Sequence, residues 1–364
     1  MKILKAYITK EFLVYFGAAL FILTFVMLLG NLIKFAYLII NKHVSILIVS
    51  KLFIYLIPYL FVYSIPIAVV VGVLFCLGRA SNDNEIIAIR ASGVNLFFIF
   101  SPLIVLGIIL SLTLVIFNDQ LIPKAHFATR RTLVDLGVKN PTAALDACTF
   151  IESFQKYILF IYKIEENKLY NIRIIEPQGP DKPNRIIVAQ KGEFISYPEK
   201  GMVKLKLIDG SSDEVDPRNP NNFYKLYFKT YFMTLNLSQE KSSQQINKKP
   251  KDMTIRELKD KINKYNQEKI DPLPYLVQFH EKFAISFSPL IFILLGIPLG
   301  VATNKREKKN KIKFVFLFVM LYYLSFIGLE ALSMQGLINV NFMWLTNLVF
   351  AAIGLTSLYR TCAY

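Results

Sequence analysis

The sequence has little of the side-chain chemistry on which most enzymes depend. Its 364 residues include only three histidines and three cysteines. The phosphate-binding pattern GxxxxGK(S/T), the zinc-binding pattern HExxH and the nucleophile pattern GxSxG are all absent from it. We therefore expect no catalytic residue, no metal site, no cofactor and no ATP hydrolysis by this chain itself.

The sequence is also poor in cysteines and, within its apolar stretches, in carboxylates. Cys76, Cys148 and Cys362 lie far apart in the sequence, so no disulfide framework follows from them. Carboxylates are rare in the apolar stretches, and Glu330 is the exception. A proton-driven pump normally carries a chain of such groups within the membrane, so this scarcity argues against one. Near the outer end of its stretch, Glu330 fits a polar contact between helices better than a proton relay.

Six long apolar stretches are the main positive feature of the sequence. A helix needs about 20 apolar residues to cross a bilayer, and 54% of the residues here are hydrophobic. Three stretches precede a long strand-like insertion and three follow it. We predict an integral membrane protein with six transmembrane helices and one soluble domain between two triplets. The stretches are 12–40, 52–77, 96–117, 279–301, 314–333 and 342–358.

Residues 148–235 show the period of two that is typical of strands. Val203, Leu205 and Leu207 alternate with lysines, and turn-forming residues separate several such runs. We predict an all-β, jellyroll-like domain, followed by a charged amphipathic helix over 255–269. The run 224–235 is apolar on both faces, which fits either a buried strand or a groove for a greasy ligand. The candidates for lining a groove are Tyr224, Leu226, Phe228 and Phe232.

The distribution of charge gives the predicted orientation. The net charge is +16, which in a membrane protein fits basic loops and anionic headgroups rather than nucleic acid. The loop over 303–313 carries six basic residues against the single Glu307, so the positive-inside rule places it in the cytoplasm. With six spans, both termini are then cytoplasmic, and the β domain is periplasmic if the cell has two membranes.

The segment 79–93, between the second and third stretches, is the most specific local pattern. Ser81 or Asn82 is a suitable N-cap, acidic residues follow, and Gly93 is a natural helix stop. We predict a short helix over about 81–92. It is either a connector lying on the headgroups or a coupling helix docked on a cytosolic partner. As a coupling helix, its contacts with the partner would come from Asp83, Glu85 and Arg90.

This segment resembles the part of the LptF/LptG lipopolysaccharide export permease family that contacts the ATPase. Residues 281–300, ending Leu-Gly-Ile-Pro-Leu-Gly, are similar to the fourth helix of that family. Residues 118–123, Asn-Asp-Gln-Leu-Ile-Pro, resemble the exit from its third helix. The layout of three helices, one domain and three helices matches from end to end. Glu281 and Lys282 depart from the more arginine-like pattern expected of the family.

The resemblance implies a substrate and several partners. It implies a β-jellyroll periplasmic domain, a heterodimer with a paralogous permease subunit, a cytosolic ABC ATPase dimer and a periplasmic bridge protein of similar jellyroll fold. The implied substrate is lipopolysaccharide, taken from the cell inner membrane. We place the first three helices in 1–123, the periplasmic domain in 124–270 and the last three helices in 271–364.

Basic residues near the predicted outer boundary are candidates for binding lipid phosphate. If the first helix begins near Phe12, Lys34 lies roughly 33 Å along it at 1.5 Å per residue, where an outer-leaflet headgroup would sit. The resemblance points to the same role, and the alternative is an anchor lysine that extends to the interface. The other candidates for this basic rim are Lys42, Lys124, Arg130 and Arg131.

These observations favour the transmembrane subunit of an ATP-driven lipid exporter. One alternative is a mechanotransmitting subunit, driven by a cytosolic ATPase, that carries no lipid itself. Another is a secondary transporter. An apolar lumen in the β domain would separate the first two, and transport that does not depend on an ATPase would favour the third.

Overall fold

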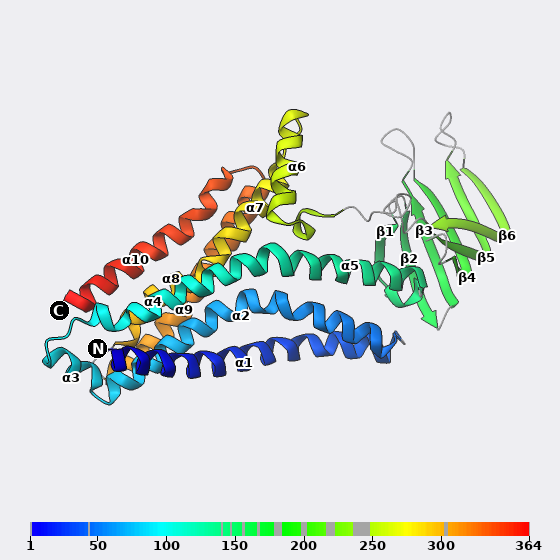
Figure 1. Cartoon of the computed structure of the whole chain (residues 1–364). Coiled ribbons are helices and arrows are strands. Elements are labelled where there is room, and N and C mark those ends of the chain that lie inside the picture. The colour runs from blue at the N-terminus through cyan, green and yellow to red at the C-terminus, as the bar shows by residue number, and fades with distance from the viewer. Residues whose placement is uncertain are drawn as a thin grey trace. The chain divides into compact units, whose positions relative to one another are not determined.

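The computed structural model describes residues 2–42, 44–139, 141–145, 148–154, 157–165, 168–177, 184–197, 202–215, 223–235, 248–301 and 305–363. The elements run in the order helices, strands, helices (Figure 1). The helices are α1 Lys2–Ile40, α2 Ile46–Asn82, α3 Glu85–Ala91, α4 Leu96–Ile116, α5 Ile122–Lys139, α6 Ile255–Gln267, α7 Leu273–Ser286, α8 Ser288–Gly300, α9 Lys305–Met334 and α10 Met343–Ala363. The strands are β1 Phe150–Phe154, β2 Tyr157–Glu165, β3 Lys168–Glu176, β4 Arg185–Tyr197, β5 Met202–Val215 and β6 Phe223–Leu235.

The described residues contain six helical segments long and apolar enough to cross a membrane. The third is built from α4 and α5, joined by a π-helical turn over Phe117–Leu121. The fourth is built from α7 and α8. The predicted membrane helices and the inserted β domain are confirmed, and the predicted amphipathic helix is α6. The segments are Lys2–Ile40, Ile46–Asn82, Leu96–Gly137, Leu273–Gly300, Phe316–Met334 and Val340–Cys362.

The chain separates into two compact units. The first comprises Met1–Leu32, Ile54–Phe127 and Lys248–Tyr364, and the second comprises Ile33–Phe53 and Ala128–Asn247. The boundary that we drew after residue 123 falls within the continuous helical segment that ends with α5. Helix α6, which we assigned to the soluble domain, belongs to the first unit.

Helices α2 and α8 pack closely because two glycines of α8 face α2. A Cβ atom on Gly300 would lie 2.9 Å from Cβ of Leu77, and one on Gly296 would lie 3.2 Å from Cγ1 of Val73. Small residues allow membrane helices to approach in this way, since lipid gives no hydrophobic drive for their association. This contact belongs to a buried apolar cluster that also includes Phe100 of α4.

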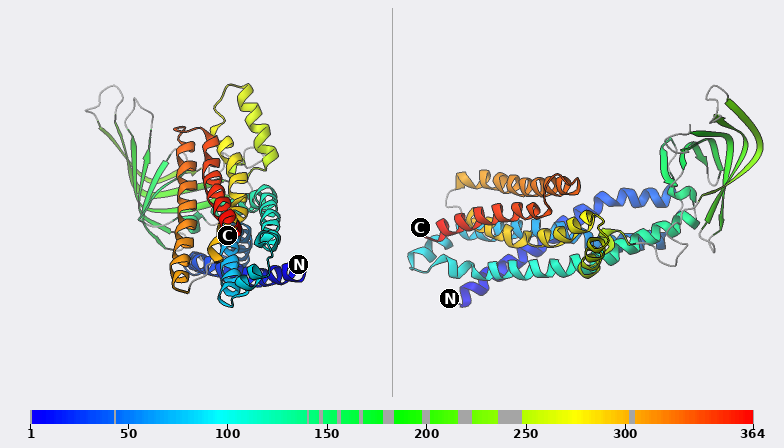
Figure 2. Two further views of the ribbon diagram at one scale, coloured as in Figure 1. Left: turned by 90° about the vertical axis from the view of Figure 1, so that its left-hand side faces the viewer. Right: turned by 90° about the horizontal axis from the view of Figure 1, so that it is seen from above.

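The β domain is one antiparallel sheet in which each strand pairs with its neighbour in sequence, in the order β1 to β6. Its core consists of alternate residues such as Leu159, Ile172 and Leu205, each fully buried. Seen in the right-hand view of Figure 2, the sheet is strongly curved.

A row of irregular positions crosses the sheet from β2 to β6. On β5, Leu205 and Leu207 face the core, but beyond Asp209 it is Gly210 and Ser212 that face it. The alternation therefore slips by one residue in every strand of the row. Two of the row's residues, Asn171 and Asp209, have φ of 53° and 54°, a left-handed conformation that Asn and Asp tolerate better than other side chains. Pairing in the register is interrupted at Tyr162, Asn171, Gln190, Asp209 and Lys229.

Candidate functional site

Helix α3 is a separate short helix, set off from α2 by a sharp turn. The prediction that Ser81 or Asn82 caps it is wrong, because both residues still belong to α2. The chain turns at Asn84, whose φ of 58° is left-handed, and its side chain makes no capping hydrogen bond. The predicted stop at Gly93 is confirmed: its φ is +73°, and its N–H donates to the carbonyl of Arg90 over 2.9 Å.

The apolar side of α3 is divided between the protein interior and the surface. Ile86 is 1% exposed and packs in one cluster with Ile8 of α1 and Leu96 of α4. Ile87, on the next position, is 48% exposed. Helix α3 therefore packs on the bundle through Ile86, with Ile89 partly buried against the same cluster, and presents Ile87 outward.

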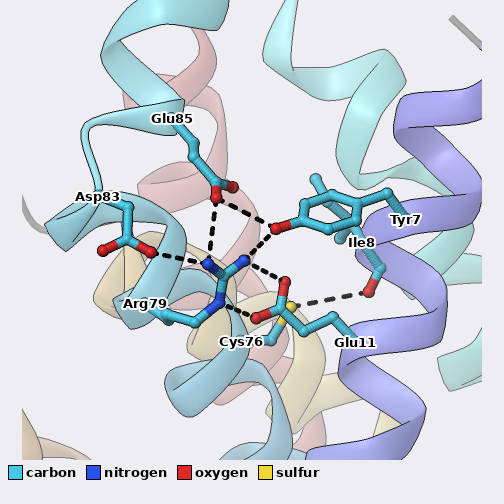
Figure 3. A network of polar contacts seen from close by, with 7 residues as sticks. All are labelled: Tyr7, Ile8, Glu11, Cys76, Arg79, Asp83 and Glu85. Atoms are coloured by element: carbon cyan, nitrogen blue, oxygen red, sulfur yellow. Dashed lines mark hydrogen bonds and ion pairs between the residues drawn. The ribbon is translucent and has the colours of Figure 1, made fainter.

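The guanidinium of Arg79 joins α1, α2 and α3 in a single polar network, which we call the Arg79 hub (Figure 3). Its Nη1 lies 2.7 Å from Oδ2 of Asp83 and 3.1 Å from Oε1 of Glu85. Its Nε and Nη2 contact the two carboxylate oxygens of Glu11, at 2.7 Å for Nη2. The planar fork of arginine suits this two-pronged contact, which lysine cannot reproduce.

Tyr7 closes the hub. Its hydroxyl accepts from Nη2 of Arg79 and donates to Oε1 of Glu85 over 3.1 Å. The Glu11 side chain is 13% exposed, whereas those of Asp83 and Glu85 are 52% and 31% exposed. The hub therefore has a buried half on α1 and an open half at α3. With one guanidinium against three carboxylates, it keeps surplus negative charge on its open side.

The other end of α3 is tied to the last helix. Nη2 of Arg90 donates to the carbonyl oxygen of Thr361, in the final turn of α10, over 2.8 Å. A cation is favoured at this end of a helix, where carbonyl groups lack partners. Helix α3 is thus held by α1 at its beginning and by α10 at its end.

The chain matches the family described as "Lipopolysaccharide export system permease LptF/LptG" over residues 6–360. It belongs to the LptF/LptG permease family. No curated protein matches this chain. Members of the family are permease subunits rather than enzymes, so the chain is a multi-pass permease of lipopolysaccharide transport.

The structure places four of the permease's five candidate headgroup ligands in the second unit, and the fifth, Lys124 on α5, in the first. Lys34 is exposed near the end of α1, and Arg131 is exposed on α5. Arg130 is partly buried on α5. Lys42 follows α1, where its ammonium donates to the carbonyl of Leu145 and lies 5.7 Å from the ring centre of Tyr37. The Lys42 ammonium therefore already has partners within the chain.

The structure divides the candidate groove residues between two faces of the sheet. Phe228 pairs with Gly210, which puts Phe228, Leu226 and Tyr224 on the core-facing side. Phe232 pairs with Lys206 and lies on the opposite face, because the row of irregular positions crosses β6 at Lys229. Leu226 and Tyr224 are both 56% exposed although they share the face of the core.

Sequence reasoning did not single out Tyr7, Glu11 or Arg79 as site residues. The spacing of Arg79 and Asp83, four residues apart on one helix, was a usable signal for an ion pair. Nothing local connects either of them to Glu11, 68 residues away from Arg79. The hub was therefore visible in part from the sequence and complete only in the fold.

Proposed function

We propose that this permease is the transmembrane subunit of an ATP-driven exporter that takes lipopolysaccharide from the inner membrane and passes it to a periplasmic bridge protein. The Arg79 hub carries the proposal, because it links a surface-exposed short helix to two membrane helices through charged groups. Membership of the family supplies the substrate class and a permease partner. The chain would pair with a paralogous permease and with a cytosolic ATPase dimer.

Helix α3 is the proposed docking element for the ATPase. Asp83 and Glu85 face outward with surplus negative charge, and Ile87 adds an exposed apolar contact. A basic, partly apolar surface on the ATPase would complement both features. Arg90, anchored on Thr361, would fix the direction of α3 beside its proposed contact with the ATPase.

Lipid contacts are proposed at two places. Lys34, Arg130, Arg131 and, more weakly, Lys42 would hold the phosphates of the headgroup as charge-assisted ligands. Tyr224, Leu226 and Phe228 would line the passage of the acyl chains on the core-facing side of the sheet, since they are apolar and two of them are more than half exposed. Phe232 would lie outside that passage.

The test of this function is reconstitution. Proteoliposomes containing lipopolysaccharide and the purified complex of this chain should release lipid to an added bridge protein only with ATP. Release without ATP would favour a secondary transporter. ATP hydrolysis without any lipid contact by this chain would favour the mechanotransmitting alternative. Orientation is tested separately in a chain whose three natural cysteines are replaced by serine, because Cys148 is exposed in the β domain. A cysteine introduced at Asn310 should resist an impermeant reagent in intact spheroplasts, and labelling would reverse the proposed topology.

A further inference from the structure

The third membrane-spanning segment contains a π-helical turn at Phe117–Leu121. Such a turn inserts one residue into the helical hydrogen-bond pattern and often marks a functional site. Within a membrane, backbone groups released by the irregularity need partners from neighbouring helices. A backbone carbonyl of this turn finds its partner on α7, and a side chain of the turn in addition binds the first residue of α6.

Lys282 of α7 supplies the first partner. Its side chain is buried, at 7% exposure for the residue, and its ammonium donates to the carbonyl oxygen of Asn118 over 2.6 Å. The Asn118 side chain donates to Oγ of Ser286 over 2.8 Å, and Ser286 donates to the carbonyl of Lys282 over 2.6 Å. The π turn and one turn of α7 thus form a closed polar ring.

Asp119, the next residue of the π turn, supplies the second connection. Its Oδ1 accepts from the backbone N–H of Ile255, the first residue of α6, over 2.6 Å. Seven residues further along the same membrane-spanning segment, Nδ1 of His126 contacts Oδ1 of the fully buried side chain of Asp252. The chain that returns to the membrane after the β domain is therefore attached at two points to one helix.

The far end of α6 is attached as well. The rings of Tyr265 and Tyr275 lie 5.1 Å apart, and their hydroxyl groups are 3.4 Å apart. Helix α6 is consequently folded back on α7 and joined to it at one end, while its other end is held by the π turn. Lys282 thus links α7 to the π turn, and Asp119 links the π turn to the start of α6.

A buried ammonium inside a membrane segment is costly and usually has a functional role. A methionine of similar length would fill the same space without that cost, and buried charged groups often add little to stability. We propose that Lys282 and Asp119 are positioning residues for transport. They hold the start of α6 on the π turn, so that ATP-driven movement of the membrane helices reaches the segment returning from the β domain. This inference rests on the proposed exporter function.

The experiment compares Lys282→Met and Lys282→Arg with the wild-type complex in proteoliposomes containing lipopolysaccharide. Lys5→Met is the matched control, because the Lys5 ammonium is also partly buried and donates to a side chain, Oγ of Ser101, over 3.2 Å. We expect Lys282→Met to lower lipid release by about tenfold, with ATP hydrolysis and the melting temperature nearly unchanged. Lys282→Arg, which keeps a donor, should recover part of the release, and Lys5→Met should match wild type.

A second comparison uses Asp119→Ala alone and together with Lys282→Met. If both side chains act through the same π turn, their effects should not add. The double variant should then release as much lipid as the single variant with the lower release. Two outcomes would overturn the inference: wild-type release by Lys282→Met, or loss of release in parallel with the melting temperature, as for a merely structural contact. Failure of the wild-type complex to release lipid with ATP would instead contradict the proposed function.

Discussion

Arg79 and Glu11 lie 68 residues apart in the chain, yet Nη2 of Arg79 lies 2.7 Å from Oε2 of Glu11. This two-pronged pair ties the first membrane helix to the end of the second, directly beside α3 (Figure 3). Because Glu11 is largely buried and Asp83 is largely exposed, the hub connects the interior of the bundle with the surface proposed for the ATPase.

The first prediction concerns Arg79. Replacing it with Met should lower the free energy of unfolding by about 1–3 kcal/mol, since the buried carboxylate of Glu11 loses its partner. Coupled lipid release should fall by about tenfold. Arg79→Lys should restore little, because lysine cannot bind both carboxylate oxygens as arginine does. Arg360→Lys, at an exposed position on α10, is the control. Full release by Arg79→Met would show that the hub is not needed for coupling.

The second prediction concerns Glu85. Charge reversal to Lys should prevent the ATPase from co-purifying with this chain, because it removes the partner of a basic group on the ATPase and adds repulsion. Loss of a charge pair buried at an interface costs about 2–5 kcal/mol of binding free energy. The chain itself should still insert, since Glu85 is at the surface. Glu268→Lys is the control. Glu268 is exposed and follows the β domain in the sequence, and its reversal should leave association with the ATPase intact. Normal association of Glu85→Lys would remove α3 as the docking element.

The third prediction uses the two faces of β6. A photo-crosslinking residue at Leu226 should capture lipopolysaccharide in an ATP-dependent manner, whereas the same residue at Phe232 should not. The two positions are matched controls, because they are 56% and 57% exposed and lie on the same strand but on opposite faces. Equal capture at both positions would contradict a passage on the core-facing side, and protein adducts alone would favour mechanotransmission.

The fourth prediction separates a phosphate ligand from an anchor at Lys34. Lys34→Arg should keep part of the transport, and Lys34→Glu should abolish it while the ATPase stays bound, because a carboxylate repels phosphate. Lys51→Glu, also exposed and in the same unit, tests whether any added negative charge has this effect. Lys34 is an anchor if the Glu variant transports lipid as well as wild type does.

The fifth prediction concerns pH and α6. Burial raises the pKa of Glu257, but the ion pair with Lys248 and the backbone N–H of Thr254 outweigh it and hold the pKa below its ordinary value. A lowered pKa in the folded state stabilises the start of α6 above the ordinary pKa of 4.5, and this contribution is lost as the pH falls through the lowered value. The protection of the α6 amides against hydrogen exchange, measured relative to the intrinsic rate at each pH, should therefore fall at low pH. Glu257→Gln should remove this extra dependence, and Glu268→Gln should not.

The sequence by itself determined the elements whose signals are local. Apolar runs of sufficient length predicted the six membrane helices, and the period of two predicted strands such as the one around Leu205. Thr254 and Glu257, three residues apart, cap α6 reciprocally, which fits the predicted helix there. The positive φ at Gly93 ends α3 where the sequence placed its stop.

Only the tertiary structure decided which residues meet. Glu11 and Arg79, or Lys282 and Asn118, come together because helices distant in sequence pack side by side, and no local pattern encodes that pairing. The division of Phe228 and Phe232 between two faces depends on a slip in alternation at Lys229, which follows from matching irregularities in the neighbouring strands. Regular alternation along β6 alone would place residues 228 and 232 on the same face, since they are four positions apart. The irregular position between them appears only in the pairing with the neighbouring strands.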